Sequence, residues 1–182
     1  MSFVVVYDAD VLYKSSVRDL LIRIAESGLI QAKWTHAILD ETFDSIRKNR
    51  PDLNPDQLAR TRELMLRGVR DCLVLDYEPL IEAVSLPDPN DRHVLAAAIK
   101  ARAQVIVTFN LRDFPAPALS RWNVEAIHPD NFVLDQIDLE KGVVYGAVQQ
   151  MADAWADGTT VDEVLASLER DGLVESVAAL RF

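Results

Sequence analysis

The stretch from Phe3 to Tyr7, FVVVY, limits the fold more than any other part of this 182-residue chain. It is continuous and β-branched, without the alternation of apolar and polar residues found in strands that have one face in water. Such runs are typical of strands covered by helices on both faces, as in parallel sheets. The sequence therefore predicts a buried strand of an α/β sheet at the N-terminus.

The rest of the chain alternates strand-like and helix-like segments, bounded by caps, glycine and proline. Further strands are predicted at 73–75, 104–108 and 124–127. Helices are predicted at 15–27, from Thr35 through Ile46, from Asn54 to about Arg70, near 79–83, from Asp88 through Ile99, and near 138–155 and 160–170. This alternation predicts a Rossmann-like three-layer α/β sandwich with a mainly parallel central sheet.

Charge divides the chain after His128. Residues 129–182 carry 11 acids and 3 bases, whereas residues 1–128 carry 18 acids and 16 bases. The apolar content of 49% is enough for one full core with a small appendage. We therefore expect an α/β domain over 1–128 and an acidic helical C-terminal extension over 129–182.

Location and partners are constrained by what the sequence lacks. It shows no signal-peptide pattern and no apolar run long enough to cross a membrane, and its one cysteine, Cys72, suits a reducing compartment. We expect a cytoplasmic chain without a membrane partner. The net charge of −10 argues against nucleic acid, but the segment from Arg47 to Arg70 holds seven bases and three acids. It is either a local polyanion site or a solvated helix face.

Polar side chains follow two of the predicted strands. Asp8 and Asp10 come directly after the first strand, and Asn110 and Asp113 follow the strand that ends at Thr108. In open α/β sheets, functional groups collect beyond the carboxyl ends of the strands. Acids in buried surroundings are costly unless they are paired or bound to a metal, and Mg²⁺ prefers such oxygen ligands.

Most of the acids also have a purely structural explanation. Asp88 and Asp91 are spaced as a helix cap and its capping-box partner, and Asp113 precedes a Phe-Pro pair where it could organise a turn. On helical periodicity Glu41 faces solvent. Asp8 is the hardest to explain structurally, because it follows an unbroken buried strand. The three histidines have no ligand-like spacing, which argues against zinc.

Four short motifs occur in order across residues 3–115: VVVYDADVL, THAILDE, DPNDRHVLAAAI and VIVTFNLRDF. In this order they resemble the PIN-domain nucleases, and the chain is similar to VapC-like toxins that carry an extra helical C-terminal segment. The opening motif alone also resembles that of the haloacid dehalogenase-like phosphatases. In that family, however, the acidic motif comes after the threonine, whereas here the acidic helix start comes before Thr108.

The resemblance implies a PIN-like fold and a metal-dependent endoribonuclease that hydrolyses RNA phosphodiester bonds as the toxin of a type II toxin–antitoxin system. It implies Mg²⁺ or Mn²⁺ as cofactor and Asp8, Glu41, Asp91 and Asp113 as metal ligands. Asn110, which stands where many relatives have an aspartate, would join them as a catalytic residue. The implied partners are RNA, a small antitoxin and a second copy in a homodimer. The alternatives are a phosphatase with Asp8 as nucleophile and a non-catalytic RNA-binding PIN protein.

Overall fold

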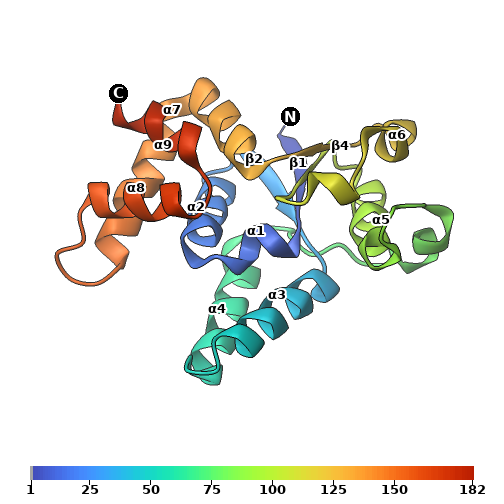
Figure 1. Ribbon diagram of the computed structural model, residues 1–182, viewed down its shortest axis with the longest axis horizontal. Coiled ribbons are helices and arrows are strands. Elements are labelled where there is room, and N and C mark those ends of the chain that lie inside the picture. Colours follow the sequence, from blue (N-terminus) through green and yellow to red (C-terminus); the bar gives the residue numbers. More distant parts are fainter. Residues whose placement is uncertain (1) are drawn as a thin grey trace.

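The computed structural model describes residues 2–182. Within these residues the chain forms a four-stranded sheet in which every pairing is parallel, in the order β2-β1-β3-β4. The strands are β1 (Phe3–Tyr7), β2 (Ile30–Lys33), β3 (Val105–Val107) and β4 (Glu125–Ile127). Helices lie on both sides of the sheet (Figure 1). The predicted three-layer α/β fold with a parallel sheet is confirmed.

Helices fill the connections between the strands. The α-helices are α1 (Ala9–Tyr13), α2 (Ser15–Glu26), α3 (His36–Asn49), α4 (Pro55–Gly68), α5 (Arg92–Lys100), α6 (Ala116–Leu119), α7 (Pro129–Ala154), α8 (Val161–Arg170) and α9 (Val174–Arg181). Short 3-10 helices are η1 (Glu78–Ala83), η2 (Pro89–Asp91), η3 (Leu111–Asp113) and η4 (Ser120–Trp122). None of the helices in residues 2–182 is long and apolar enough to cross a membrane.

The helix boundaries follow the local signals in the sequence. Thr35 Oγ1 accepts a hydrogen bond from Ile38 N at the start of α3, and Asn54 Oδ1 accepts one from Asp56 N at the start of α4. Gly28 adopts a φ of 84° just after α2, a conformation that favours glycine. These predicted caps and the predicted stop are confirmed.

One predicted strand is wrong and one strand was missed. Leu73 makes only an isolated bridge to Trp34, so 73–75 is not a strand. The fourth strand is β2, whose sequence IQAK has no β-branched run because it lies at the sheet edge and buries only alternate residues. The helix predicted near 138 begins nine residues earlier, at Pro129, and is interrupted by non-helical φ/ψ angles at Glu140.

The sheet topology places a switch point between β1 and β3. The chain passes from β1 to β2 in one direction across the sheet, and from β3 to β4 in the other. Ligand sites of open α/β sheets lie at such a point, beyond the carboxyl ends of the strands. Here those ends are joined, because Asp8 N donates to Val107 O over 3.1 Å.

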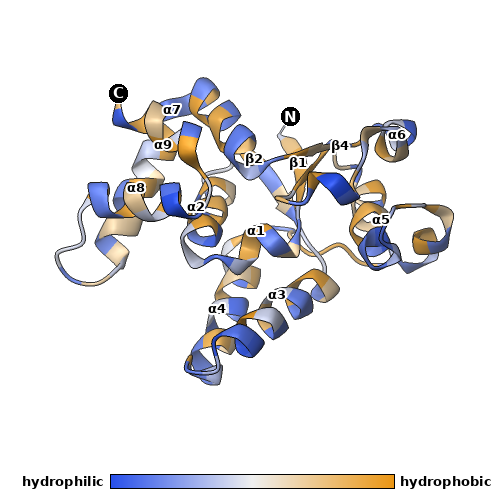
Figure 2. Cartoon of the chain, in the orientation of Figure 1, coloured by the Kyte–Doolittle hydropathy of each residue, from blue (hydrophilic) through white to orange (hydrophobic). Residues whose placement is uncertain are grey.

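The C-terminal helices share the core of the rest of the chain. One hydrophobic cluster contains Val5 of β1, Leu21 of α2, Val148 of α7 and Leu168 of α8. Colouring by hydropathy shows apolar residues through the sheet and polar outer faces on α3 and α4 (Figure 2). The division after residue 128 therefore stays a prediction about sequence organisation.

Candidate functional site

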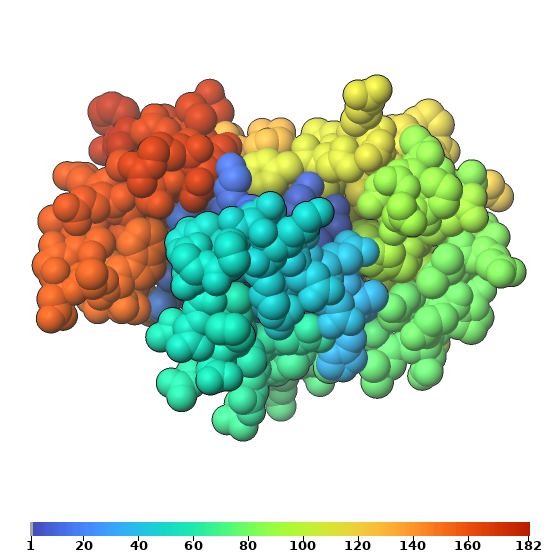
Figure 3. Space-filling model, turned by 60° about the horizontal axis from the view of Figure 1, so that its bottom comes forward, coloured from blue at the N-terminus to red at the C-terminus, as the bar shows by residue number. Residues whose placement is uncertain are grey.

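A pocket of about 830 Å³ lies at the switch point of the sheet. Its polar lining includes Asp8 and Asp10 after β1, Glu41 on α3, Asp91 at the start of α5, and Asn110 after β3. In the space-filling view, N-terminal atoms lie at the bottom of a hollow between the cyan, yellow and orange-red segments (Figure 3). Segments far apart in the sequence thus meet at one acidic depression.

Asp8 is held firmly where β1 turns into α1. Its side chain is 7% exposed, and Oδ1 accepts a hydrogen bond of 2.8 Å from Ala9 N. Oδ2 lies 2.9 Å from Thr108 Oγ1, at the end of β3. Burial raises the pKa of Asp8 to about 6, with a further contribution from the neighbouring Asp10 carboxylate. A negative charge at this position is therefore unfavourable without a counter-ion.

Asp10 holds the loop that follows β3. Its Oδ2 lies 3.1 Å from Thr108 Oγ1, and its Oδ1 accepts a hydrogen bond of 3.2 Å from Phe109 N. Asn110 N in turn donates to Thr108 Oγ1 over 3.0 Å. Burial raises the pKa of Asp10 as well. Because its oxygens are engaged with this loop, Asp10 is suited to positioning Asn110.

Asp91 carries an oxygen without a partner. Its Oδ2 is buried and accepts no hydrogen bond from any residue between 2 and 182. Burial raises the pKa of Asp91 to about 6, and the charges of Asp8, Asp88 and Asp113 act in the same direction. The capping-box interpretation of Asp91 is wrong, because its side chain makes no cap bond, whereas Asp88 Oδ1 accepts one from Asn90 N over 2.9 Å.

Asp113 completes a second acidic grouping around Asp91. One oxygen each of Asp88, Asp91 and Asp113 lies within 4.8 Å of the other two. Asn110 Nδ2 donates to Asp113 Oδ2 over 2.7 Å, which ties Asn110 to the same grouping. Of the residues singled out from the sequence, four therefore line one pocket, namely Asp8, Glu41, Asp91 and Asn110, and Asp113 adjoins them through Asp91 and Asn110.

Glu41 has a partner that the sequence did not indicate. His93 Nε2 lies 2.7 Å from Glu41 Oε1, and the Glu41 side chain is 49% exposed. Burial alone would lower the pKa of His93, but the hydrogen bond and the charge of Glu41 raise it overall. Glu41 shares its helix face with Ser45 and Asn49, four and eight residues on, which also line the pocket. The helix face predicted to be exposed therefore lines this pocket.

The donor set fits a hard divalent cation. All candidate ligands are carboxylate oxygens, which Mg²⁺ and Mn²⁺ prefer. Burial, with the neighbouring carboxylates, raises the pKa values of Asp8 and Asp91, so their ionised forms are unfavourable without a counter-ion, and Asp91 Oδ2 lacks a donor within the described chain. A bound cation would stabilise the ionised carboxyls and would also give Asp91 Oδ2 a partner.

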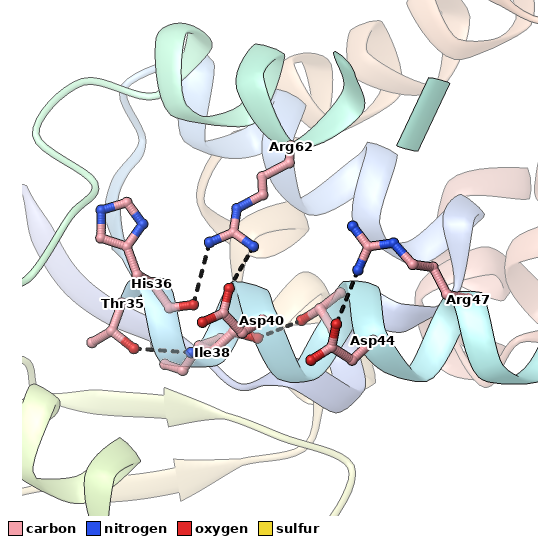
Figure 4. Close-up of polar contacts among 8 residues, drawn as sticks. Thr35, His36, Ile38, Asp40, Asp44, Arg47 and Arg62 are labelled. Atoms are coloured by element: carbon pink, nitrogen blue, oxygen red, sulfur yellow. Dashed lines mark hydrogen bonds and ion pairs between the residues drawn. The ribbon is translucent and has the colours of Figure 1, made fainter. Parts of the chain in front are cut away.

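The basic segment from Arg47 to Arg70 is partly neutralised by nearby acids. Arg62 Nη1 lies 2.6 Å from Asp40 Oδ1, and Arg47 Nη1 lies 2.9 Å from Asp44 Oδ1 (Figure 4). Two further arginines of the segment pair with acids in the same way, Arg50 with Asp52 and Arg67 with Glu63. Four of the seven bases between Arg47 and Arg70 are therefore paired, whereas Lys48, Arg60 and Arg70 are exposed and have no ion pair within residues 2–182.

Comparison with known proteins adds to this geometry. Residues 4–112 match a family model described as a PIN domain, and residues 129–182 match one described as the VapC50 C-terminal domain. A relative named "Putative ribonuclease VapC50" from Mycobacterium tuberculosis (strain ATCC 25618 / H37Rv) is 43% identical over 90 residues, which are 50% of this chain and 53% of the relative. The match thus spans about half of that relative's length. No solved structure matches significantly.

Proposed function

This chain belongs to the PIN-domain family, and from that premise we propose that it is a Mg²⁺- or Mn²⁺-dependent endoribonuclease, the toxin of a type II toxin–antitoxin pair. The observation that carries the proposal is the convergence of Asp8, Glu41 and Asp91 on one pocket at the switch point. The similarity to a protein named as a ribonuclease supports RNA as the substrate.

Asp8, Glu41, Asp91 and Asp113 would hold the cation. At neutral pH the carboxyls of Asp8 and Asp91, with pKa values of about 6, are mostly ionised and available as ligands. When bound, the ion neutralises charge on the phosphodiester and makes a water molecule more acidic.

Orientation is a second contribution of the pocket. Besides offering an oxygen to the cation, Glu41 lines the pocket, is kept in place by His93 over 2.7 Å, and would orient the attacking water. Thr108 and Asp10 fix the loop that presents Asn110, whose amide is linked to Asp113. Hydrolysis by water leaves a 5′-phosphate and a 3′-hydroxyl. The low exposure of Asp8 limits competing solvent around that carboxylate.

A cleavage assay tests the proposal. Structured RNA is incubated with Mn²⁺ and with wild type, Asp8→Asn or Asp91→Asn, and Asp157→Asn serves as the control because Asp157 lies in the exposed loop between α7 and α8. We expect chelation to abolish cleavage. Each pocket variant should lose more than the roughly 10- to 100-fold that follows removal of an outer-shell partner. Equal cleavage by all four proteins would refute the site.

The toxin role has its own test. Induced expression of the wild type should arrest bacterial growth, while Asp8→Asn at the same protein level should not. A small antitoxin and a second copy of the chain remain the proposed protein partners. RNA binding without cleavage under all metal conditions would instead favour the non-catalytic RNA-binding alternative. A phosphorylated Asp8 after incubation with a phosphomonoester would favour the phosphatase.

A further inference from the structure

A second, smaller cavity adjoins the acidic pocket. It has a volume of about 280 Å³ and is lined by the basic residues Lys14, Arg18 and Arg50, by Asp171, and by apolar side chains of α3 and α4. Tyr13 and Lys14 line both cavities, so the two meet along the α1–α2 turn. An extended polyanion lying across the acidic pocket would therefore reach a basic one next to it.

Arg18 is a fixed cation at the edge of this cavity. Its Nη1 donates to the carbonyl oxygens of Leu12 and Tyr13 over 2.9 and 3.2 Å, which orients the guanidinium. Among residues 2–182, no carboxylate lies within ion-pair distance of it, and burial lowers the pKa of Arg18. A partly buried cation without a counter-ion is unfavourable, so an anion entering the cavity would be stabilised.

Lys14 stands between the two cavities. It caps the start of α2, where no side-chain cap bond forms within the described chain, and the positive end of the helix dipole adds to its charge. Its Nζ lies 5.7 Å from the centroid of the Phe109 ring, above the loop that carries Asn110. Arg50, the third basic residue, is already paired with Asp52, so Lys14 and Arg18 are the cations available to a ligand.

The C-terminal extension already places one carboxylate here. Asp171, at the end of α8, accepts a hydrogen bond of 2.5 Å from Ser16 Oγ and lies 3.9 Å from Lys14 Nζ. The contact to Lys14 is long for an ion pair, and no ion pair joins Asp171 to Arg18 within residues 2–182. The cavity thus accommodates an anion while leaving much of its positive charge unmatched.

We propose that this cavity, through Lys14 and Arg18, binds a phosphodiester group of the RNA strand next to the one that is hydrolysed, and that Asp171 competes with it. The inference rests on the proposed ribonuclease function. It also gives the acidic extension a part in substrate binding, because its charge lowers the affinity of the cavity for RNA.

Binding in the absence of metal tests the cavity separately from catalysis. Fluorescence anisotropy with a short labelled single-stranded RNA, in EDTA, gives the dissociation constant as a function of salt concentration. For Lys14→Gln we expect binding about tenfold weaker, as for loss of one charged hydrogen bond. The slope of log K against log salt should become shallower by about 0.7. Lys100→Gln, the same charge change at the C-terminal end of α5 and outside the lining of both cavities, should match the wild type.

Two matched variants test whether Asp171 competes with RNA for the cavity. Asp171→Asn should bind the RNA several-fold more tightly, whereas Asp157→Asn, the same charge change in an exposed loop of the extension, should have little effect. Arg18→Gln should weaken binding as Lys14→Gln does. Because Arg18 also bonds backbone carbonyls, thermal unfolding of each variant checks that the fold is retained.

The outcomes separate the two proposals. Equal affinity and equal salt slope for wild type, Lys14→Gln and Lys100→Gln would overturn the phosphodiester cavity, even if Mn²⁺-dependent cleavage persists. Failure of the wild type to bind the RNA would overturn it too. RNA binding with the expected pattern but no cleavage under any metal condition would support the cavity and overturn the nuclease function.

Discussion

Replacing Asp8 with Asn should stabilise the metal-free protein while abolishing its response to metal. Burial and Asp10 raise the pKa of Asp8 from 3.8 to about 6, so its ionised form is disfavoured in the folded state. That difference corresponds to about 3 kcal/mol at neutral pH. The variant removes the charge but weakens the contact with Thr108, which is worth about 1 kcal/mol. A net gain of about 1–2 kcal/mol in the free energy of unfolding should remain.

The sign of the pH dependence follows from the same pKa. Because the folded-state value lies above that of the unfolded chain, the folded protein binds more protons between pH 3.8 and about 6. The contribution of Asp8 to stability is therefore most favourable below this window and falls as pH rises through it. The stability advantage of Asp8→Asn over the wild type should grow across the window and be constant above it.

Urea unfolding in EDTA at several pH values gives the free energy of unfolding of the wild type and of Asp8→Asn. Tryptophan fluorescence follows the unfolding, because Trp34 is fully buried in the folded protein. Asp130→Asn is the control, because Asp130 is also 7% exposed but accepts hydrogen bonds from Glu175 N, Ser176 N and Ser176 Oγ. That control should lose about 1–3 kcal/mol. Adding Mn²⁺ at 100 times its dissociation constant should stabilise the wild type by about 2.7 kcal/mol and leave Asp8→Asn unchanged. A destabilised Asp8→Asn, or an advantage independent of pH, would refute the reasoning.

Three other perturbations have defined outcomes. His93→Ala frees Glu41 and should weaken Mn²⁺ binding about 10- to 100-fold by calorimetry, while His93→Gln, which keeps a donor, should restore much of it. Gly172→Ala should cost about 1–3 kcal/mol in urea unfolding, because φ is 112° and the added Cβ would lie 3.0 Å from the Phe109 ring. Mn²⁺ affinity should be constant well above pH 6 and fall as pH drops through about 6, where Asp91 takes up a proton.

Local sequence signals were sufficient for most of the fold. The run from Phe3 to Tyr7 predicted a buried strand, and it became β1, an interior strand between β2 and β3 that is buried from Val5 to Tyr7, while Phe3 is exposed. Caps at Thr35 and Asn54 fixed the starts of α3 and α4. Strand β2 was not predictable in the same way, because an edge strand needs only alternate buried residues. It is a strand because its backbone pairs with β1, and that pairing joins separate segments of the chain.

The acids of the site were predictable, but their partners were not. Asp8 and Asn110 follow strands whose carboxyl ends must meet in a parallel sheet, so their proximity follows from topology. The contact of Glu41 with His93 joins residues 52 apart, and that of Lys14 with Asp171 joins residues 157 apart. No periodicity within either segment indicates such a contact, since it depends on how α3, α5 and α8 pack.

Segment charge alone does not show which cations are available to a polyanion. The stretch from Arg47 to Arg70 has an excess of bases in the sequence, yet Arg47 and Arg62 are matched by Asp44 and Asp40 of α3 (Figure 4). By contrast, Arg18, near the start of α2, has no carboxylate within ion-pair distance among residues 2–182. Affinity for phosphate depends on cations that the fold leaves unmatched, so we expect the RNA path to include the cavity beside the α1–α2 turn, which Lys14 and Arg18 line.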